Sequence, residues 1–328
     1  MKNTDKGNSI LKGKTVVITG ASSGVGRAAA EAFAQEGCNL ILAARGWKGI
    51  NEVVDYCRTL NVHVVGISAD MSIAEDVEKV AAGALATSGK IDIWINNAGV
   101  MASGKFEEIP LEIHQQVIKT NLFGYMHGAY NAIKIFKEQN QGILINNVSI
   151  GGFMPAPYSA VYSASKFGIK GMMECLQGEI SNHKDIHVCN LYPQLQNSTG
   201  NLHSAKYSGF DITIPFIASD PRETAAKMVY LAKHPKKDLF PDFKAAAITR
   251  TYKLFPKIIS NTASTALRMK MKSNENKEGN PGNVLSNSKE PLRVYGNLPS
   301  KRDFNFAKTA LMGLGFAAGL FLVLKKSS

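Results

Sequence analysis

The sequence predicts an α/β fold, in which a parallel, doubly wound sheet is covered by helices on both faces. Short apolar runs alternate with helix-length segments through at least six strand–helix steps between residues 14 and 192. A glycine-rich turn follows the first apolar run, and polar residues follow several later ones. Strands that alternate with helices form parallel sheets, because each crossover helix returns the chain to the same edge.

Composition and charge narrow the class of protein. The chain has 328 residues, 45% of them hydrophobic and 20% charged, enough for a substantial core. Residues 1–230 hold 20 basic and 20 acidic side chains, whereas residues 231–328 hold 18 and 6, so the net charge of +12 lies near the C-terminus. No nucleic-acid-binding motif accompanies it, and we expect no nucleic-acid partner. The cysteines lack Cys-x-x-Cys spacing, which predicts free thiols and no metal site (Cys38, Cys57, Cys175 and Cys189).

The first strand and helix enclose a glycine-rich turn. Residues 14–19 are predicted as a buried strand, followed by Gly20-Ala-Ser-Ser-Gly24-Val-Gly26 and a helix over 27–36. Backbone N–H groups and the positive helix end would there face a pyrophosphate. Gly20 suits the tight turn, Gly24 a close approach to phosphate, and Gly26 close helix packing. At the first strand-to-helix step, this pattern indicates dinucleotide binding.

The end of the second strand bears on the choice of dinucleotide. This strand, 39–44, is followed by Arg45, and the next acidic residue is Glu52. NAD-binding units usually carry a carboxylate here for the ribose hydroxyls, whereas an arginine accommodates a 2′-phosphate. The sequence therefore favours NADP(H) over NAD(H). The alternative is that Arg45 is a solvated loop residue.

The alternation continues with segments predicted as helix 48–60, strand 62–68, helix 73–87 and strand 91–95. Asp70 follows the third strand, where its carboxylate would meet an adenine or cap the next helix. The fourth strand is followed by Asn96-Asn97-Ala98-Gly99. Ligands bind at this edge of such sheets, so these polar residues are candidates for the site.

One long helix is predicted over 111–137, with Asn121 near its middle. Asparagine competes for backbone hydrogen bonds, and from the residues alone we expect a kink or a capping contact there. Strand 142–148, helix 158–181 and strand 186–192 complete the sheet.

A tyrosine–lysine pair carries the candidate chemistry. Tyr162 and Lys166 are four residues apart and share one helix face. A nearby ammonium favours the phenolate, which brings the phenol pKa closer to neutral pH. Ser149 ends a strand upstream, where its hydroxyl could hold a carbonyl or alcohol oxygen beside the phenol. A second such pair, Tyr130 and Lys134, has no strand end nearby and is predicted to lie on a surface helix.

Together these motifs identify a family resemblance. Residues 10–235 resemble the short-chain dehydrogenase/reductases, which have a Rossmann-like fold. The match comprises the motif Thr19-Gly-x-x-x-Gly24-x-Gly26, the motif Asn96-Asn97-Ala98-Gly99, Asn121, Ser149 and Tyr162-x-x-x-Lys166.

The resemblance implies roles that spacing alone does not give. Tyr162 would be the general acid/base, Ser149 would orient the substrate oxygen, and Asn121 would hold a water of the proton relay. Lys166 would lower the pKa of Tyr162 and bind the nicotinamide ribose. The motifs and the resemblance together give the candidate cofactor residues Gly20, Ser22, Ser23, Gly24, Val25, Gly26, Arg45, Asp70, Met71, Asn97, Ala98, Gly99, Tyr162, Lys166 and Pro193.

The loop after the sixth strand departs from the family pattern. The family carries Pro-Gly and then a threonine, whereas this chain has Pro193-Gln194, with Ser198 where the threonine is expected. Glutamine does not adopt a positive φ as readily as glycine, so we expect a reshaped loop beside the nicotinamide. Residues 197–221 correspond to the family's substrate lid. Their apolar side chains suit a hydrophobic or lipid-like substrate, although ordinary loop burial explains them as well (Leu202, Tyr207, Phe210, Ile212, Ile214, Phe216 and Ile217).

The C-terminal third of the sequence suggests that the protein is attached to a membrane. Residues 243–272 have a basic helical pattern that suits either a peripheral helix pair or a surface on anionic lipid headgroups. Residues 304–326 contain an uncharged run from Thr309 to Leu324, which predicts a single membrane anchor rather than a core helix. We therefore expect five segments: a flexible N-terminus (1–10), a catalytic domain (11–240), a basic helical extension (241–272), a flexible linker (273–303) and the anchor (304–326).

The predicted protein is an NADP-preferring oxidoreductase that interconverts an alcohol and a ketone or aldehyde. We expect it to be membrane-anchored, with the catalytic domain in the cytoplasm, and to form a homodimer or homotetramer. The alternative is a non-catalytic NADP(H)-binding scaffold or sensor at a membrane, which the glutamine at position 194 favours and the intact Asn–Ser–Tyr–Lys set disfavours.

Overall fold

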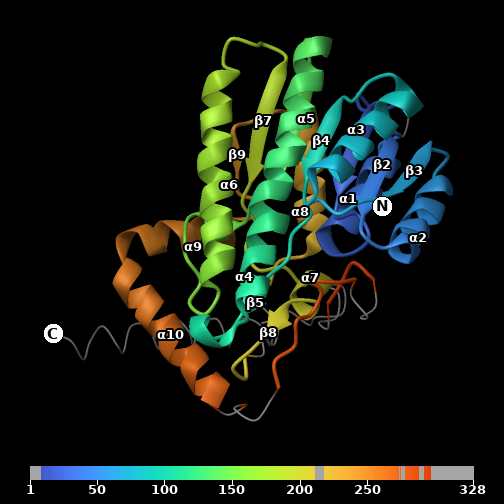
Figure 1. The fold of residues 1–328 in the computed structure, drawn as a ribbon. Helices are drawn as coiled ribbons and strands as arrows, with labels where there is room; N and C mark the ends of the chain where they lie inside the picture. Colours follow the sequence, from blue (N-terminus) through green and yellow to red (C-terminus); the bar gives the residue numbers. More distant parts are fainter. Residues whose placement is uncertain (1–8, 211–217, 273, 275–277, 288–291, 297–328) are drawn as a thin grey trace, which may run out of the picture. The chain divides into compact units, whose positions relative to one another are not determined.

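A seven-stranded parallel sheet forms the centre of the computed structural model, which describes residues 9–210, 218–272, 274, 278–287 and 292–296. The strand order is β3-β2-β1-β4-β6-β7-β9, so the chain winds outward in both directions from β1 (Figure 1). All six neighbouring pairs are parallel. The strands are β1 (Thr15–Thr19), β2 (Asn39–Ala44), β3 (Val64–Ser68), β4 (Ile93–Asn96), β6 (Gly142–Asn147), β7 (Ile186–Leu191) and β9 (Asp238–Leu239).

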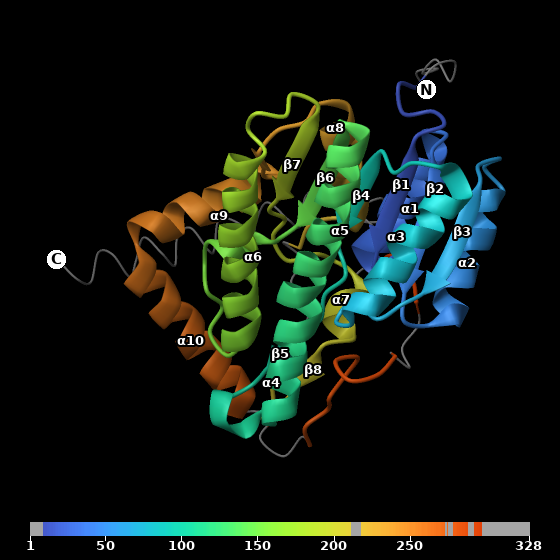
Figure 2. The same ribbon diagram turned by 45° about the horizontal axis from the view of Figure 1, so that its top comes forward.

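Helices cover both faces of the sheet, and alternate strand residues point to each (Figure 2). In β1, Val16 and Ile18 join one apolar cluster and Val17 joins the other. The first face packs against α1 (Gly24–Gln35), α2 (Trp47–Arg58) and α8 (Pro221–Lys233). The second packs against α3 (Ala74–Ser88), α5 (Gly124–Gln139) and α6 (Ala160–Glu179). The predicted Rossmann-like class is confirmed.

Shorter elements gather near the carboxyl ends of the strands. The helix predicted over 111–137 is interrupted: a π-helical turn (Lys119–Phe123) separates α4 (Leu111–Ile118) from α5. Helix α8 and strand β9 were not predicted. The remaining elements are β5 (Ala102–Ser103), β8 (Ala205–Lys206), α7 (Thr199–Leu202), α9 (Phe243–Leu254), α10 (Pro256–Lys272) and two 3₁₀ turns (Phe106–Glu108 and Ile150–Gly152).

The three segments predicted after the catalytic domain are described to different extents by the structure. The basic extension forms α9 and α10. Of the segment expected to be a free linker, residues 278–287 and 292–296 pack onto the domain: Val284 and Val294 are buried in apolar clusters. This differs from the expectation because apolar side chains interrupt the polar sequence. The anchor predicted at 304–326 lies outside the described residues, and within the described part no helix is long and apolar enough to span a membrane.

A ladder of buried polar side chains crosses the sheet near its carboxyl edge. Asn96, Asn146 and Asn190 occupy paired positions on β4, β6 and β7. The Nδ2 of Asn96 donates to Asn146 Oδ1 at 3.0 Å, and that of Asn146 donates to Asn190 Oδ1 at 3.3 Å. Asn190 donates in turn to Asp238 of β9 at 3.3 Å. These bonds fix the relative register of the strand ends on which the site is built.

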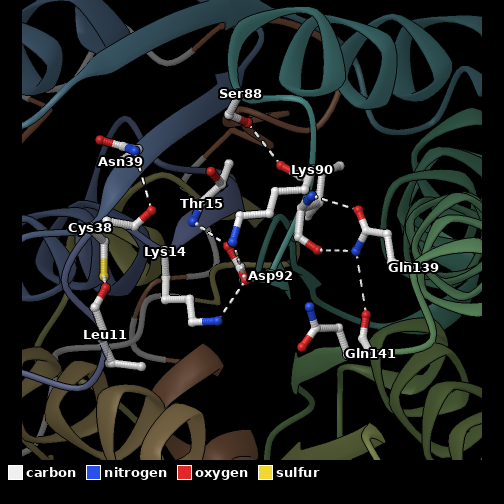
Figure 3. A network of polar contacts seen from close by, with 12 residues as sticks. Leu11, Lys14, Thr15, Cys38, Asn39, Ser88, Lys90, Asp92, Gln139 and Gln141 are labelled. Atoms are coloured by element: carbon white, nitrogen blue, oxygen red, sulfur yellow. Dashed lines mark hydrogen bonds and ion pairs between the residues drawn. The ribbon is translucent and has the colours of Figure 1, made fainter.

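The amino edge of the sheet is held by a buried carboxylate, Asp92 (Figure 3). It accepts hydrogen bonds from the Thr15 backbone N–H at 2.9 Å and from the ammonium groups of Lys14 at 2.9 Å and Lys90 at 3.2 Å. Burial raises the pKa of Asp92, but these three donors outweigh it and the net pKa is lowered. The carboxylate therefore ties the start of β1 to the start of β4.

Replacing Asp92 with asparagine should destabilise the fold in a pH-dependent way. Because the folded pKa of Asp92 is depressed, its charge stabilises the fold above the unfolded value of about 3.9 and this contribution is lost as pH falls through the folded value. We expect Asp92→Asn to lower the free energy of unfolding by about 1–3 kcal/mol at pH 7, with the difference shrinking below about pH 4. Urea unfolding at pH 7 and pH 3 tests this, with exposed Asn51→Ala as a neutral control; a pH-independent difference would contradict it.

Candidate active site

One cavity of about 720 Å³ lies at the carboxyl edge of the sheet. The structure brings together on its walls every residue that the sequence assigned to the cofactor, together with Ser149. Asn121 is the one candidate residue that does not line it. Residues far apart in the sequence therefore converge on a single site.

The glycine-rich turn is packed too tightly for other residues at two of its positions. Gly20 has φ +66°, and a Cβ there would lie 2.8 Å from the Cα of Ala98. A Cβ on Gly26 would overlap the carbonyl oxygen of Gly20. Gly24 has φ +55° and faces the cavity, with Ser23 as the N-cap residue of α1. The N-terminus of α1 is thus drawn against the end of β1, as phosphate binding requires.

Asn97 fastens this turn to β4. Its Nδ2 donates to the carbonyl oxygens of Thr19 at 3.0 Å and Gly20 at 3.3 Å, and its backbone N–H donates to Thr19 Oγ1 at 2.9 Å. Its Oδ1 accepts from Asn147 Nδ2 at 2.9 Å. Asn147 Oδ1 is buried beside the cavity without a hydrogen-bond partner. This unsatisfied acceptor suits a ligand donor, and the sequence interpretation missed the residue.

Ser149 has an unusual backbone conformation, with φ +98° and ψ +152°. This region is nearly restricted to glycine and costs about 1–3 kcal/mol for other residues. The 3₁₀ turn that follows holds it: Gly151 N–H donates to Ser149 Oγ at 3.1 Å, and Ile150 N–H donates to the Pro193 carbonyl at 2.9 Å. Glycine would adopt this conformation without strain, but of the two only serine supplies a hydroxyl on the cavity wall that also holds Tyr162.

Tyr162 and Lys166 lie on α6 and face the cavity. Burial raises the pKa of Tyr162 above its ordinary value of 10, and the Ser149 side chain lowers it by less. Burial alone lowers the pKa of Lys166 to about 7. The expected lowering of the Tyr162 pKa by Lys166 is therefore not found here: burial raises the pKa of Tyr162, and burial of Lys166 removes part of the lysine charge at neutral pH.

Aromatic rings and one carbonyl surround the Lys166 ammonium. Its Nζ lies 5.0 Å from the ring centroid of Tyr125 and 5.7 Å from that of Tyr162. The Asn147 carbonyl oxygen accepts from Lys166 Nζ at 3.4 Å and from the Tyr125 hydroxyl at 2.7 Å. Tyr125 was not predicted as a site residue, because it carries no motif and only its contact with the lysine reveals it.

Asn121 lies in the π-helical turn and is fully buried. Its Nδ2 donates to the Val100 carbonyl at 2.9 Å and to Ser165 Oγ at 3.0 Å, and its Oδ1 accepts from the Val100 N–H at 2.8 Å. The side chain is thus largely occupied in joining the loop after β4 to α6. It positions these elements, and the structure gives it no direct contact with the cavity.

Two charged residues that were predicted to contact the cofactor, Asp70 and Arg45, also line the cavity. Asp70 Oδ1 accepts from both the N–H and the hydroxyl of Ser72, at 2.9 and 2.7 Å, so it stabilises the turn before α3. Arg45 is not a solvated loop residue. Its guanidinium donates to the carbonyl oxygens of Asn283 at 2.5 Å, Val284 at 3.2 Å and Ser286 at 3.2 Å.

The glutamine that replaces the family glycine is accommodated by a side-chain network. Gln194 is buried and is not among the residues with positive φ, so its loop has an ordinary backbone at that position. Its Nε2 donates to Ser219 Oγ at 2.8 Å, and Ser219 donates to Asp242 Oδ2 at 2.5 Å. Asp242 caps the N-terminus of α9. The loop beside the catalytic residues is therefore connected to the basic extension.

The basic extension also contributes one wall of the cavity. Tyr252 of α9 and Ile259, Ala263 and Leu267 of α10 line it. Within the expected lid, Phe210 lines the cavity, whereas Leu202 and Tyr207 do not. The other apolar lid residues lie at 211–217, outside the described part of the chain. The second tyrosine–lysine pair lies on the exposed face of α5, with Tyr130 69% exposed, so its predicted surface position is confirmed.

Comparison with known proteins gives the class of protein. The family model for short chain dehydrogenases matches residues 14–206, which is more than half of the chain. The chain therefore belongs to the short-chain dehydrogenase/reductase family, and it is an NAD(P)-dependent oxidoreductase.

Individual relatives agree with this assignment. The chain is 34% identical to 3beta-hydroxysteroid dehydrogenase 1 of Eggerthella lenta over 193 residues, which cover 58% of this chain and 74% of that protein. It is similar to a solved actinorhodin polyketide ketoreductase with NADPH (25% identity, TM-score 0.63, covering 70% of this chain and 95% of the other). A Burkholderia phymatum family member in complex with NAD shares the fold (24% identity, TM-score 0.67, covering 76% and 95%).

The low pKa of Lys166 predicts that this residue costs stability. Between about pH 7 and pH 10 the unfolded lysine is protonated while the folded one is neutral, so stability rises with pH across this window. We expect Lys166→Met to raise the free energy of unfolding by about 2–4 kcal/mol at pH 6 and by little near pH 10. Thermal unfolding at both pH values tests this, with exposed Lys134→Met as the matched control; a variant less stable than wild type at pH 6 would refute it.

Proposed function

We propose that the protein is an NADP-preferring oxidoreductase that interconverts an alcohol and a ketone or aldehyde in an apolar, lipid-like substrate. The observation that carries this proposal is the placement of Tyr162. This phenol lines the same cavity as Ser149, whose side chain acts to lower the phenol pKa, and as the turn from Gly20 to Gly26. A proton donor and a dinucleotide-binding turn on one cavity suit hydride and proton transfer to a single carbonyl group.

The residues present fit a dinucleotide. The turn glycines allow close approach of phosphate to the backbone. Asn147 Oδ1 is a buried acceptor without a hydrogen-bond partner, so it can accept a bond from a ligand donor. The turn would hold the pyrophosphate, Arg45 a 2′-phosphate, and Lys166 the nicotinamide ribose. When bound, the nicotinamide supplies or accepts a hydride at its C4 position.

The chain's own groups supply the proton chemistry. Ser149 orients the substrate oxygen, and Tyr162 donates a proton to it in reduction and accepts one in oxidation. The protonated form of Lys166 stabilises the phenolate that remains after donation. With a pKa of about 7, Lys166 keeps part of its charge at neutral pH, and the Asn147 carbonyl holds its Nζ in place.

The cavity walls support an apolar substrate. Beyond Tyr162 the lining includes Met154, Phe210, Ile259 and Leu267, and no acidic side chain other than Asp70 lines any part of the cavity within the described chain. The relative from Eggerthella lenta is a hydroxysteroid dehydrogenase, whose name implies an apolar substrate of comparable class. An alcohol or carbonyl on a hydrophobic scaffold suits such a pocket.

The exposed side chains of α9 and α10 support a membrane location. Residues 243–272 hold seven basic and no acidic side chains, and all seven are exposed (Lys244, Arg250, Lys253, Lys257, Arg268, Lys270 and Lys272). Phe243, Leu254 and Met269 are 81%, 72% and 70% exposed among them. Basic residues with interleaved apolar ones suit an anionic leaflet. We propose that this surface and the apolar run at 309–324 hold the catalytic domain on the cytoplasmic side of a membrane.

Replacing Tyr162 with phenylalanine should abolish turnover without removing nucleotide binding. Loss of general acid catalysis costs about 10²–10⁴-fold in rate, whereas the phenyl ring preserves the packing on α6. The measurement is NADPH oxidation with a panel of apolar ketones and aldehydes, beside NADPH affinity by fluorescence. Tyr130→Phe, in the surface pair, should retain full activity. Equal rates for the wild type and Tyr162→Phe would refute the mechanism, and binding without any turnover would favour the scaffold alternative.

Membrane binding should have two separable parts. The full chain should remain with membranes through a high-salt wash, and a chain that ends at residue 297, where the compact unit ends, should be released. Each basic residue near an anionic surface contributes about 1 kcal/mol. We therefore expect Lys253→Glu with Lys257→Glu to weaken binding of the shorter chain to phosphatidylserine vesicles at least about tenfold.

The matched control is Lys48→Glu with Lys137→Glu, which changes the net charge equally at exposed positions on α2 and α5. An equal loss in the control would refute a specific surface, and release of the full chain by salt would refute the anchor.

A further inference from the structure

Two short stretches near the C-terminus, residues 278–287 and 292–296, lie across the nucleotide end of the cavity. We name them together the C-terminal strap. In Figures 1 and 2 the strap, coloured orange to red, passes from β8 toward α2. Asn283, Asn287 and Leu292 line the same cavity as the glycine-rich turn.

The strap places backbone carbonyl oxygens on two groups assigned to the phosphates, the Gly24 N–H and the Arg45 guanidinium. At one end, the Arg293 carbonyl accepts from the Gly24 N–H at 2.9 Å, and the Leu292 carbonyl accepts from Arg27 at 2.7 Å. At the other end, three carbonyl oxygens of residues 283–286 accept from the Arg45 guanidinium. Carbonyl oxygens and phosphate oxygens are acceptors for the same donors, so the two cannot occupy these positions together.

Defined hydrogen bonds and apolar contacts hold the strap against the domain. The Lys206 and Asn280 backbones exchange hydrogen bonds at 2.8 and 2.7 Å, and Asn283 N–H donates to the His203 carbonyl at 2.8 Å. Val284 is fully buried in a cluster with Val100 and Ala102. Gly282 has φ +56°, and a Cβ there would overlap the His203 carbonyl oxygen.

We propose that the C-terminal strap is an intramolecular competitor of the dinucleotide, and that cofactor binding displaces it. The proposal rests on the proposed function, because it takes Gly24 and Arg45 as phosphate-binding groups. The pyrophosphate of either cofactor competes with the Arg293 carbonyl, whereas only NADP(H) carries a 2′-phosphate that competes for Arg45. Bonds from arginine to phosphate are charge-assisted and stronger than bonds to carbonyl groups, so a 2′-phosphate displaces the strap at Arg45.

The strap also sets the apparent affinity. A protein whose competent state is only a fraction of the population binds more weakly by that fraction. If the open state is about one tenth of the population, release of the strap tightens the apparent dissociation constant about tenfold.

The first experiment measures NADPH binding to the full chain. In Gly282→Val, a β-branched residue would have to adopt a left-handed backbone, and its Cβ would overlap the His203 carbonyl oxygen. The strap therefore cannot keep its position against the domain. We expect NADPH to bind about tenfold more tightly than to wild type. The matched control is Gly89→Val, at φ +69° with no neighbouring atom within 4 Å of its Cβ, which should bind within about twofold of wild type. Unchanged or weaker binding to Gly282→Val would overturn the proposal.

The second experiment uses the wild-type chain. Trypsin cleavage after Arg293 should become faster when NADPH is added, because the segment leaves the Gly24 N–H. Adenosine, which has no phosphate, should leave the cleavage rate unchanged. Protection of Arg293 by NADPH would show that the strap is a wall of the filled site and would overturn the proposal.

These outcomes are independent of the test of function. Tightened binding without Tyr162-dependent turnover refutes the proposed activity alone. Turnover that depends on Tyr162, with unchanged affinity in Gly282→Val, refutes the competitor role alone.

Discussion

Asn147 connects the glycine-rich turn to α5 and α6 through three hydrogen bonds, which it makes with Asn97, Tyr125 and Lys166. Its side chain donates to Asn97, which in turn holds the Thr19 and Gly20 carbonyls at the start of the turn. Its carbonyl oxygen holds Tyr125 and the Lys166 ammonium. Because this residue ends β6, beside the ladder residue Asn146, the register of the sheet sets the separation between the glycine-rich turn and the candidate proton-transfer residues on α6. The geometry of the site is thus a consequence of strand pairing.

Two of the candidate catalytic residues, Ser149 and Lys166, are held in states that are costly for their residue types. Ser149 has a backbone conformation suited to glycine, and Lys166 is desolvated until its pKa is about 7. Both cost folding free energy. The sheet offsets this cost by burying apolar side chains on both faces, with all five residues of β1 buried. Apolar packing remote from the site therefore allows strained and desolvated groups within it.

Local patterns predicted the sheet and most of the site, whereas contacts between distant residues were not predictable. The end of β2 and the glycine turn follow from periodicity and spacing within a few residues. The importance of Asn147 does not, since asparagine at a strand end is common and its partners lie elsewhere in the chain. The contact between Arg45 and Val284 spans 239 residues. A polar stretch rich in asparagine and glycine resembles a linker, and only the burial of Val284 distinguishes it.

The strap changes how Arg45 should be understood. Carbonyl oxygens accept three hydrogen bonds from its guanidinium but carry no net charge, so the cation is held in place without being neutralised. Burial lowers the pKa of Arg45, with Asp70 opposing this, and a buried cation gains most from an anion. Under the proposal, the strap would keep the Arg45 guanidinium ordered while blocking it, and exchange for a phosphate would give the guanidinium an anionic partner. Under the proposed displacement, a preference for NADP(H) would arise from what replaces the strap, and the identity of residue 45 alone would not determine it.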